Sequence, residues 1–184
     1  ANNIANVNTT VGAFTSNVDR MLAMATQMHG AHVTVAVFPE AVVGGYPPED
    51  LIQWKAFVDR QWVELTRFAE GTKGAPTVFV VGVAVQHQGL RYNCAAVIAG
   101  GRVRGLVPKE KLPTYNIFYE GRTFARGRPG MAEVHVSGVP LGVPEVEPAL
   151  TTGRINACYG SPLAAVALQW NTKVKYMTSM PMSY

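Results

Sequence analysis

Three side chains that could act together on a carbonyl group follow strand-like segments of this chain. Glu40 comes directly after one apolar run, and Lys109 comes after another, with Glu120 a short distance further on. A carboxylate can accept a proton as a general base, and an ammonium group can stabilise the oxyanion of a tetrahedral intermediate. A carboxylate at the carboxyl end of a buried strand also lies where α/β proteins place their ligands. We therefore expect acid–base chemistry, with partial burial raising the pKa of Glu40.

Each of these residues also has an ordinary structural interpretation. Glu40 could cap a helix or bond a loop, and Lys109 could face solvent as most lysines do. Lys111, two residues further on, competes with Lys109 for the same role. Glu120 could form a weak surface ion pair with an arginine that follows it, Arg122 or Arg126.

Other residue types that commonly form catalytic, metal or nucleotide sites give weaker evidence for such a site here. Cys94 lies in a predicted strand, where cysteine usually behaves as a small buried hydrophobe. The 4 histidines have no ligand spacing and no Cys-x-x-Cys pair is present, so we expect no metal. No glycine-rich phosphate loop appears either, and we expect nucleotides to bind elsewhere.

Apolar periodicity predicts the elements that position the candidate residues. Residues 17–29 carry apolar side chains at helical spacing, with Asn17 as the expected N-cap. The run 33–38 predicts a strand buried on both faces that ends just before Glu40. A short strand is expected at residues 4–7.

The following segments continue the alternation of helix and strand. A second helix should begin at Pro48 and run to about residue 70, because proline and acidic residues favour a helix start. Residues 77–85 predict a buried strand, and residues 92–99 and 101–107 predict two strands around a glycine turn. This order predicts an α/β fold with a central sheet and helices outside it.

Composition limits the class of protein. With 184 residues, 48% of them hydrophobic, the chain fits a single domain over residues 1–184 with a sizeable core. The charged fraction of 15% is low, which favours a surface covered by an oligomer partner or by further sequence. Two cysteines make no disulfide framework, and no apolar run reaches the roughly 20 residues that span a bilayer. We expect a cytoplasmic protein with no membrane partner.

The net charge of +4 is modest, although basic residues gather between residues 102 and 128. Such a cluster could form an anion-binding or nucleic-acid face. No nucleic-acid-binding motif accompanies it, so we favour a solvated loop region around one functional lysine and expect no nucleic-acid partner.

Two motifs resemble the nitrilase (carbon-nitrogen hydrolase) superfamily, and within it the glutaminase domain of glutamine-dependent NAD synthetases. Phe38-Pro39-Glu40 is similar to the glutamate motif, and Pro108-Lys109 is similar to the lysine motif. Two further strings, at residues 45–51 and 112–115, resemble the NAD synthetase branch. The resemblance covers about residues 8–130, and the chain is expected to be truncated or incompletely represented beyond them.

The resemblance implies a fold and a set of roles. The family folds as a four-layer αββα sandwich, here incomplete at the C-terminal end. Glu40 would be the general base, Lys109 the oxyanion-stabilising residue, and Glu120 a second glutamate that supports the site. Tyr115 and Phe118 would line the substrate pocket.

The nucleophile that the resemblance implies is a cysteine, which would pass through a thioester. Cys158 keeps the chain order of glutamate, lysine and cysteine, although Tyr159-Gly160 follows it where the family usually has Glu-Asp. An alternative register places Glu147 at the position of the nucleophile, which would leave an inactive chain.

The activity implied is hydrolysis of glutamine, with ammonia passed to a synthetase domain that amidates nicotinic acid adenine dinucleotide. ATP and Mg²⁺ would belong to that synthetase domain, with no cofactor in this one. A homo-oligomer is expected. Two alternatives stay open: a free-standing amidase acting on another small amide, and a catalytically inactive scaffold subunit.

Overall fold

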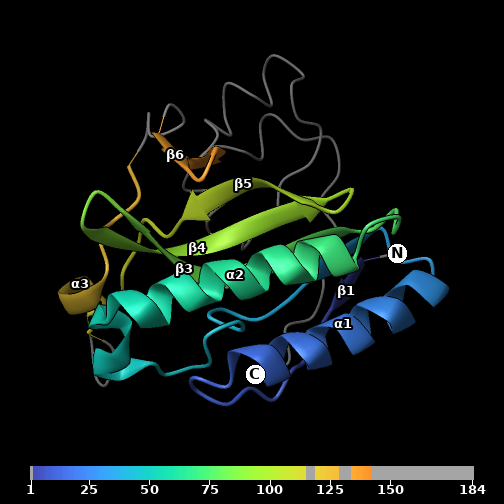
Figure 1. The fold of residues 1–184 in the computed structure, drawn as a ribbon, viewed down its shortest axis with the longest axis horizontal. Helices are drawn as coiled ribbons and strands as arrows, with labels where there is room; N and C mark the ends of the chain where they lie inside the picture. The colour runs from blue at the N-terminus through green and yellow to red at the C-terminus, as the bar shows by residue number, and fades with distance from the viewer. Residues whose placement is uncertain (1, 115–118, 129–133, 142–184) are drawn as a thin grey trace, which may run out of the picture. The chain divides into compact units, whose positions relative to one another are not determined.

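A mixed β-sheet with two long helices packed against it forms the part of the chain that the structure describes (Figure 1). The structure is a computed structural model, and it describes residues 2–114, 119–128 and 134–141. The strand order is β1-β2-β3-β4-β5-β7-β6. The predicted α/β class is confirmed, while the single domain over 1–184 stays a prediction.

The first half of the sheet is parallel and is built from two strand–helix–strand crossovers. Here β1 (Asn2–Ile4), β2 (Val35–Val37) and β3 (Val78–His87) pair in parallel. The connecting helices are α1 (Phe14–Gly30) and α2 (Lys55–Gly71), which lie side by side. This second strand was predicted to be buried on both faces, but only one face of β2 is fully buried. Ala36 is buried, whereas Val35 and Val37 are half-buried.

The second half of the sheet is mainly antiparallel. The strands β4 (Leu90–Ala99) and β5 (Arg102–Pro108) extend from β3 as a meander, close to the predicted ranges. Beyond β5 lie two short strands, β7 (Val139–Leu141) and β6 (Val134–Val136). Consequently β2 and β5 are separated by two strands, β3 and β4.

The prediction of one continuous helix from Pro48 to about residue 70 was wrong, because this segment forms two helices. A short 3₁₀ helix, η1 (Glu49–Gln53), is separated from α2 by Trp54, whose backbone is extended with φ −81° and ψ 120°. Both pieces bury apolar side chains, Ile52 from η1 and Phe57 from α2. Apolar periodicity therefore continues across the interruption and does not reveal it.

The N-cap prediction for Asn17 was also wrong, because α1 already begins at Phe14. Asn17 is fully buried inside the helix, where its amide nitrogen donates to the carbonyl oxygens of Thr10 and Val43, at 2.9 and 3.2 Å. Its Oδ1 accepts from the Thr10 N–H at 3.0 Å. The residue thus ties α1 to the segment that follows β2.

The hydrophobic core joins the helices to the sheet through an aromatic cluster. Phe38, directly after β2, meets Phe68 of α2 edge-on, with ring centroids 5.5 Å apart. Phe68 meets Phe79 of β3 in the same way at 5.5 Å. All three rings are buried, and edge-to-face packing stabilises such clusters beyond their apolar area. The segment leading to Glu40 is thereby anchored at its start.

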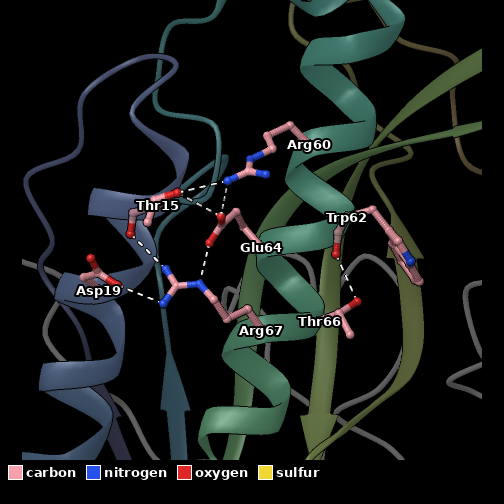
Figure 2. Close-up of polar contacts among 7 residues, drawn as sticks. All are labelled: Thr15, Asp19, Arg60, Trp62, Glu64, Thr66 and Arg67. Carbon is pink, nitrogen blue, oxygen red and sulfur yellow. Dashed lines mark hydrogen bonds and ion pairs between the residues drawn. The ribbon is translucent and has the colours of Figure 1, made fainter.

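A buried carboxylate, Glu64, locks the two helices together (Figure 2). Its oxygens accept from Arg60 at 2.8 Å, from Arg67 at 2.6 Å and from the Thr15 hydroxyl at 2.9 Å. Arg67 also reaches Asp19 of α1 at 2.8 Å. Burial raises the pKa of Glu64, but the hydrogen bonds from Arg67 and Thr15 outweigh burial and hold the pKa below its usual value. All of its partners are structural groups of the two helices.

No helix in the described ranges is both long and apolar enough to cross a membrane.

Candidate active site

Glu40, Lys109 and Glu120 converge on one ion cluster. The Lys109 Nζ lies 2.8 Å from Glu40 Oε1, and it lies 3.2 and 3.0 Å from Oε1 and Oε2 of Glu120. The three residues come from distant parts of the sequence: Glu40 follows β2, Lys109 follows β5, and Glu120 begins the short helix α3 (Glu120–Thr123). The structure therefore brings together the three candidates that sequence reasoning had selected on separate motifs.

The sheet alone would hold Glu40 and Lys109 too far apart. Three strand spacings of about 4.8 Å separate β2 from β5, or roughly 14 Å. After β2 the chain continues beside β3, where the Phe38 N–H donates to the Val80 carbonyl at 2.8 Å. The turn at Pro39–Ala41 then folds over β3, with Ala41 in the left-handed region at φ 52°. This turn carries Glu40 toward Lys109.

Gly82 of β3 makes the crossing possible. A Cβ atom at Gly82 would lie 2.4 Å from the Pro39 carbonyl oxygen, 2.5 Å from the Ala41 nitrogen and 2.7 Å from the Glu40 Cα. All three neighbours are backbone atoms, so no flexible side chain could move away. A glycine inside a strand commonly marks such a close backbone approach. Sequence reasoning missed Gly82, although its position within an otherwise apolar strand was the available signal.

The main chain of Lys109 is fixed on two sides. Its N–H donates to the Asn93 carbonyl of β4 at 2.7 Å, and its carbonyl accepts from the Gly127 N–H at 3.0 Å. A Cβ at Gly127 would meet the Pro108 carbonyl oxygen at 2.6 Å, which explains a glycine there. The lysine side chain is thus presented from a rigid backbone.

Asn93 is a second residue that sequence reasoning missed. It is buried in β4, and its Nδ2 donates a 2.5 Å hydrogen bond to Glu40 Oε1, the oxygen that also accepts from Lys109. Asparagine is depleted in strands, and a buried amide is costly unless it is bonded. An asparagine at a strand position beside a cysteine and a tyrosine was therefore the available signal.

Glu40 and Lys109 each stabilise the charged form of the other. Burial raises the pKa of Glu40, but hydrogen bonds from Lys109 and Asn93 outweigh burial and leave the pKa below its usual value. Burial lowers the pKa of Lys109, but hydrogen bonds to Glu40 and Glu120 outweigh burial and raise it. The expectation of a raised pKa for Glu40 was wrong, because two donors share its Oε1. At neutral pH the pair is a carboxylate and an ammonium.

Glu120 has the opposite shift. It is more buried than Glu40, with a side chain 9% exposed against 45%, and burial together with the negative charge of Glu40 raises its pKa despite Lys109. Tyr46 stands close enough that Glu120 and Glu40 add to burial in raising the pKa of its phenol. Two carboxyl groups of different proton affinity thus share one ammonium group.

The other predicted residues fall into two groups. Lys111 is 91% exposed and pairs with Glu110 at 3.7 Å, so it does not reach the cluster. Cys94 is buried, and burial raises the pKa of its thiol, as expected for a structural cysteine. The predicted Tyr115, Phe118 and Cys158, and the alternative Glu147, lie outside the described residues.

Sequence comparison relates the chain to one group of enzymes. It is 38% identical over 135 residues to the glutamine-dependent NAD(+) synthetase of Xylella fastidiosa strain Temecula1, covering 72% of this chain and 24% of that protein. It is 35% identical over 133 residues to the Mycobacterium bovis protein of the same name, covering 72% and 20%. The chain thus spans about a quarter of the length of the curated relatives it matches. No family model matches the chain.

Solved structures share the fold of this chain. The glutamine-dependent NAD(+) synthetase of Cytophaga hutchinsonii superposes with a TM-score of 0.71 at 23% identity, over 76% of this chain and 24% of that one. The carbon-nitrogen hydrolase of Helicobacter pylori superposes with a TM-score of 0.54 at 18% identity, over 76% and 48%. These two likenesses concern the fold. Together, the comparisons show that the matched part of the chain is homologous to part of the glutamine-dependent NAD synthetases and that it shares its fold with a carbon-nitrogen hydrolase.

Proposed function

We propose that this chain carries the glutaminase site of a glutamine-dependent NAD synthetase. The observation that supports it most is the position of Lys109, whose ammonium group lies between Glu40 and Glu120 within 3.2 Å of both. The relatives that match the chain are named for their dependence on glutamine, which requires release of ammonia from a carboxamide.

In the proposed reaction Glu40 accepts the proton of the Cys158 thiol, and the thiolate sulfur attacks the amide carbonyl carbon of glutamine. The carbon–nitrogen bond of the tetrahedral intermediate breaks, Glu40 returns the proton to the nitrogen, and ammonia leaves. Water then attacks the thioester as Glu40 accepts one of its protons. The carbon–sulfur bond breaks and Glu40 passes the proton to the sulfur, which releases glutamate and restores the thiol. Cys158 enters this scheme through the family resemblance.

Lys109 suits the oxyanion role because an ammonium group has three N–H donors. With one N–H donated to Glu40 and one to Glu120, the third would donate to a developing oxyanion. Glu120 would hold the ammonium in place through its contacts at 3.0 and 3.2 Å. Tyr115 and Phe118 would line the glutamine pocket, as the resemblance implies.

The same proposal extends to the larger assembly. Ammonia would pass to a synthetase part that uses ATP and Mg²⁺ to amidate nicotinic acid adenine dinucleotide, with no cofactor in the glutaminase part. We propose a cytoplasmic homo-oligomer with no membrane or nucleic-acid partner. The sheet with its covering helices would be one half of a four-layer αββα sandwich.

Two other functions would use the same cluster differently. A free-standing amidase would hydrolyse another small amide, and a scaffold subunit would hydrolyse none. A panel of glutamine, aliphatic amides and carbamoyl compounds separates the three, because only a glutaminase would prefer glutamine.

Replacement of Lys109 tests the proposal. Lys109→Ala removes an oxyanion donor, and loss of one such donor costs about 100- to 1000-fold in kcat. Ammonia release from glutamine should fall at least that far, while circular dichroism stays that of a folded chain. Lys111→Ala is the matched control, because Lys111 is an exposed lysine that does not reach the cluster. Equal turnover of the Lys109→Ala variant and the unmodified protein would refute the assignment.

A further inference from the structure

Asn93 contacts both members of the central ion pair: its side chain contacts Glu40, and its main chain contacts Lys109. Its carboxamide donates to Glu40 Oε1 at 2.5 Å, and its carbonyl accepts from the Lys109 N–H at 2.7 Å. Glu40 and Lys109 reach the cluster from strands on opposite sides of the β3–β4 pair. Asn93 lies between them, and it is the point at which both are fixed to the same strand.

The surroundings of Asn93 make this double contact rigid. The residue is 6% exposed, and its Cα pairs with Ala84 in the nine-residue antiparallel ladder of β3 and β4. Its neighbour Cys94 pairs with Pro108, directly before Lys109. Because the strand positions on both sides are paired, Asn93 cannot shift without disturbing the sheet.

Glu40, by contrast, stands on a turn and has a side chain 45% exposed. A carboxylate with that freedom would sample several rotamers in water, and Lys109 could follow it, since lysine is flexible. The amide of Asn93 restricts Glu40 from the buried side of the site. Its N–H group also favours the ionised carboxylate, because a hydrogen bond to the charged form stabilises that form.

We propose that Asn93 is a positioning residue of this site, whose side chain fixes the Glu40 carboxylate and whose carbonyl fixes the Lys109 backbone, so that base and ammonium keep one geometry during turnover. The catalytic consequence of this inference rests on the proposed glutaminase function. The geometric consequence does not, and it can be measured in a chain that turns over no glutamine.

Two variants separate the hydrogen bond from the shape of the residue. Asn93→Ala removes the donor and the bulk, whereas Asn93→Asp keeps the shape and replaces the donor by an acceptor. Thr77→Val is the matched control: Thr77 is 2% exposed and donates a buried 2.7 Å hydrogen bond to the Val33 carbonyl, just before β3 begins and away from the cluster. Each of the three changes therefore removes one side-chain hydrogen bond made by a buried residue.

The first readout is the titration of Glu40, followed by ¹³C NMR of the glutamate carboxyl groups and assigned with Glu40→Gln. We expect the pKa of Glu40 to be higher in both Asn93 variants than in the unmodified protein, and unchanged in Thr77→Val. An unchanged titration in a folded Asn93→Ala or Asn93→Asp protein would overturn the inference.

The second readout is the pH profile of glutamine hydrolysis. Misplacement of a reacting group by about 1 Å costs on the order of 100-fold, so kcat should fall by about that factor in both Asn93 variants with little change in KM. The acidic limb of the profile should move to higher pH. A raised pKa with kcat within twofold of the unmodified protein would contradict a positioning role. A raised pKa in a protein that hydrolyses no glutamine at all would support the geometry and refute the proposed function.

Discussion

At the scale of single residues, the site contains two carboxyl groups whose environments separate their proton affinities. Glu40 is half-exposed and accepts from two donors, so its pKa is lowered, whereas Glu120 is buried beside a second negative charge, so its pKa is raised. Such separation commonly assigns different roles to two acids in one site. The ionised Glu40 fits the proton acceptor, and Glu120 fits the residue that holds the ammonium.

The raised pKa of Glu120 predicts a pH-dependent effect on stability. The folded chain binds this proton more tightly than the unfolded chain, so the contribution of Glu120 to stability is lost as the pH rises from about 4 through its folded pKa. Glu120→Gln removes this loss. The stability of Glu120→Gln relative to the unmodified protein should therefore increase between pH 4 and pH 7.

Urea unfolding at the two pH values measures this difference. Glu110→Gln serves as the control, since Glu110 is an exposed glutamate whose nearest partner is Lys111. The control should show no such increase. A relative stability of Glu120→Gln that stays constant or falls with pH would mean that the carboxyl is not destabilised by its surroundings.

At the scale of secondary-structure elements, the site depends on backbone segments that pass very close to one another. The turn after β2 crosses β3 at Gly82, and the segment at Gly127 lies against the end of β5. Both contacts need the absence of a side chain. The geometry of the ion cluster is therefore set by glycines that carry no chemistry of their own.

Gly82→Ala tests this dependence. Its Cβ would meet three backbone atoms at 2.4 to 2.7 Å, so the turn that carries Glu40 must move. We expect a loss of about 1–3 kcal/mol in the free energy of unfolding, typical of overpacking, together with a large fall in glutamine turnover. Gly105→Ala in β5 is the control, because a Cβ there meets no atom within 4 Å. Equal stability and turnover of the two variants would show that the turn tolerates a side chain at Gly82.

The sequence was sufficient to predict most of the strands and helices. The family resemblance selected Lys109 over Lys111; Lys109 contacts Glu40 and Lys111 does not, while the role of Lys109 stays a prediction. Apolar runs of the correct period predict elements, and the motifs around Glu40 and Lys109 are short and local. The break at Trp54 and the start of α1 could not be predicted, since apolar spacing continues across both. Asn93 and Gly82 were missed because their roles depend on contacts with residues more than forty positions away.

At the scale of the whole molecule, Glu40 follows the parallel half of the sheet and Lys109 follows the antiparallel half. The segments that carry Glu40 and Lys109 follow β2 and β5, and they converge over β3 and β4. The matched region corresponds to about a quarter of the length of the NAD synthetases that resemble it.

The central claim is that this cluster activates a cysteine toward the carboxamide of glutamine. The most direct measurement is labelling of the protein with a glutamine-mimicking electrophile, followed by intact-mass analysis and peptide mapping. The account predicts one label, on Cys158, that forms much more slowly in Lys109→Ala and is absent in Cys158→Ser. Cys94 should stay unlabelled, because it is buried and its thiol pKa is raised. No label, or a label on another residue, would contradict the account.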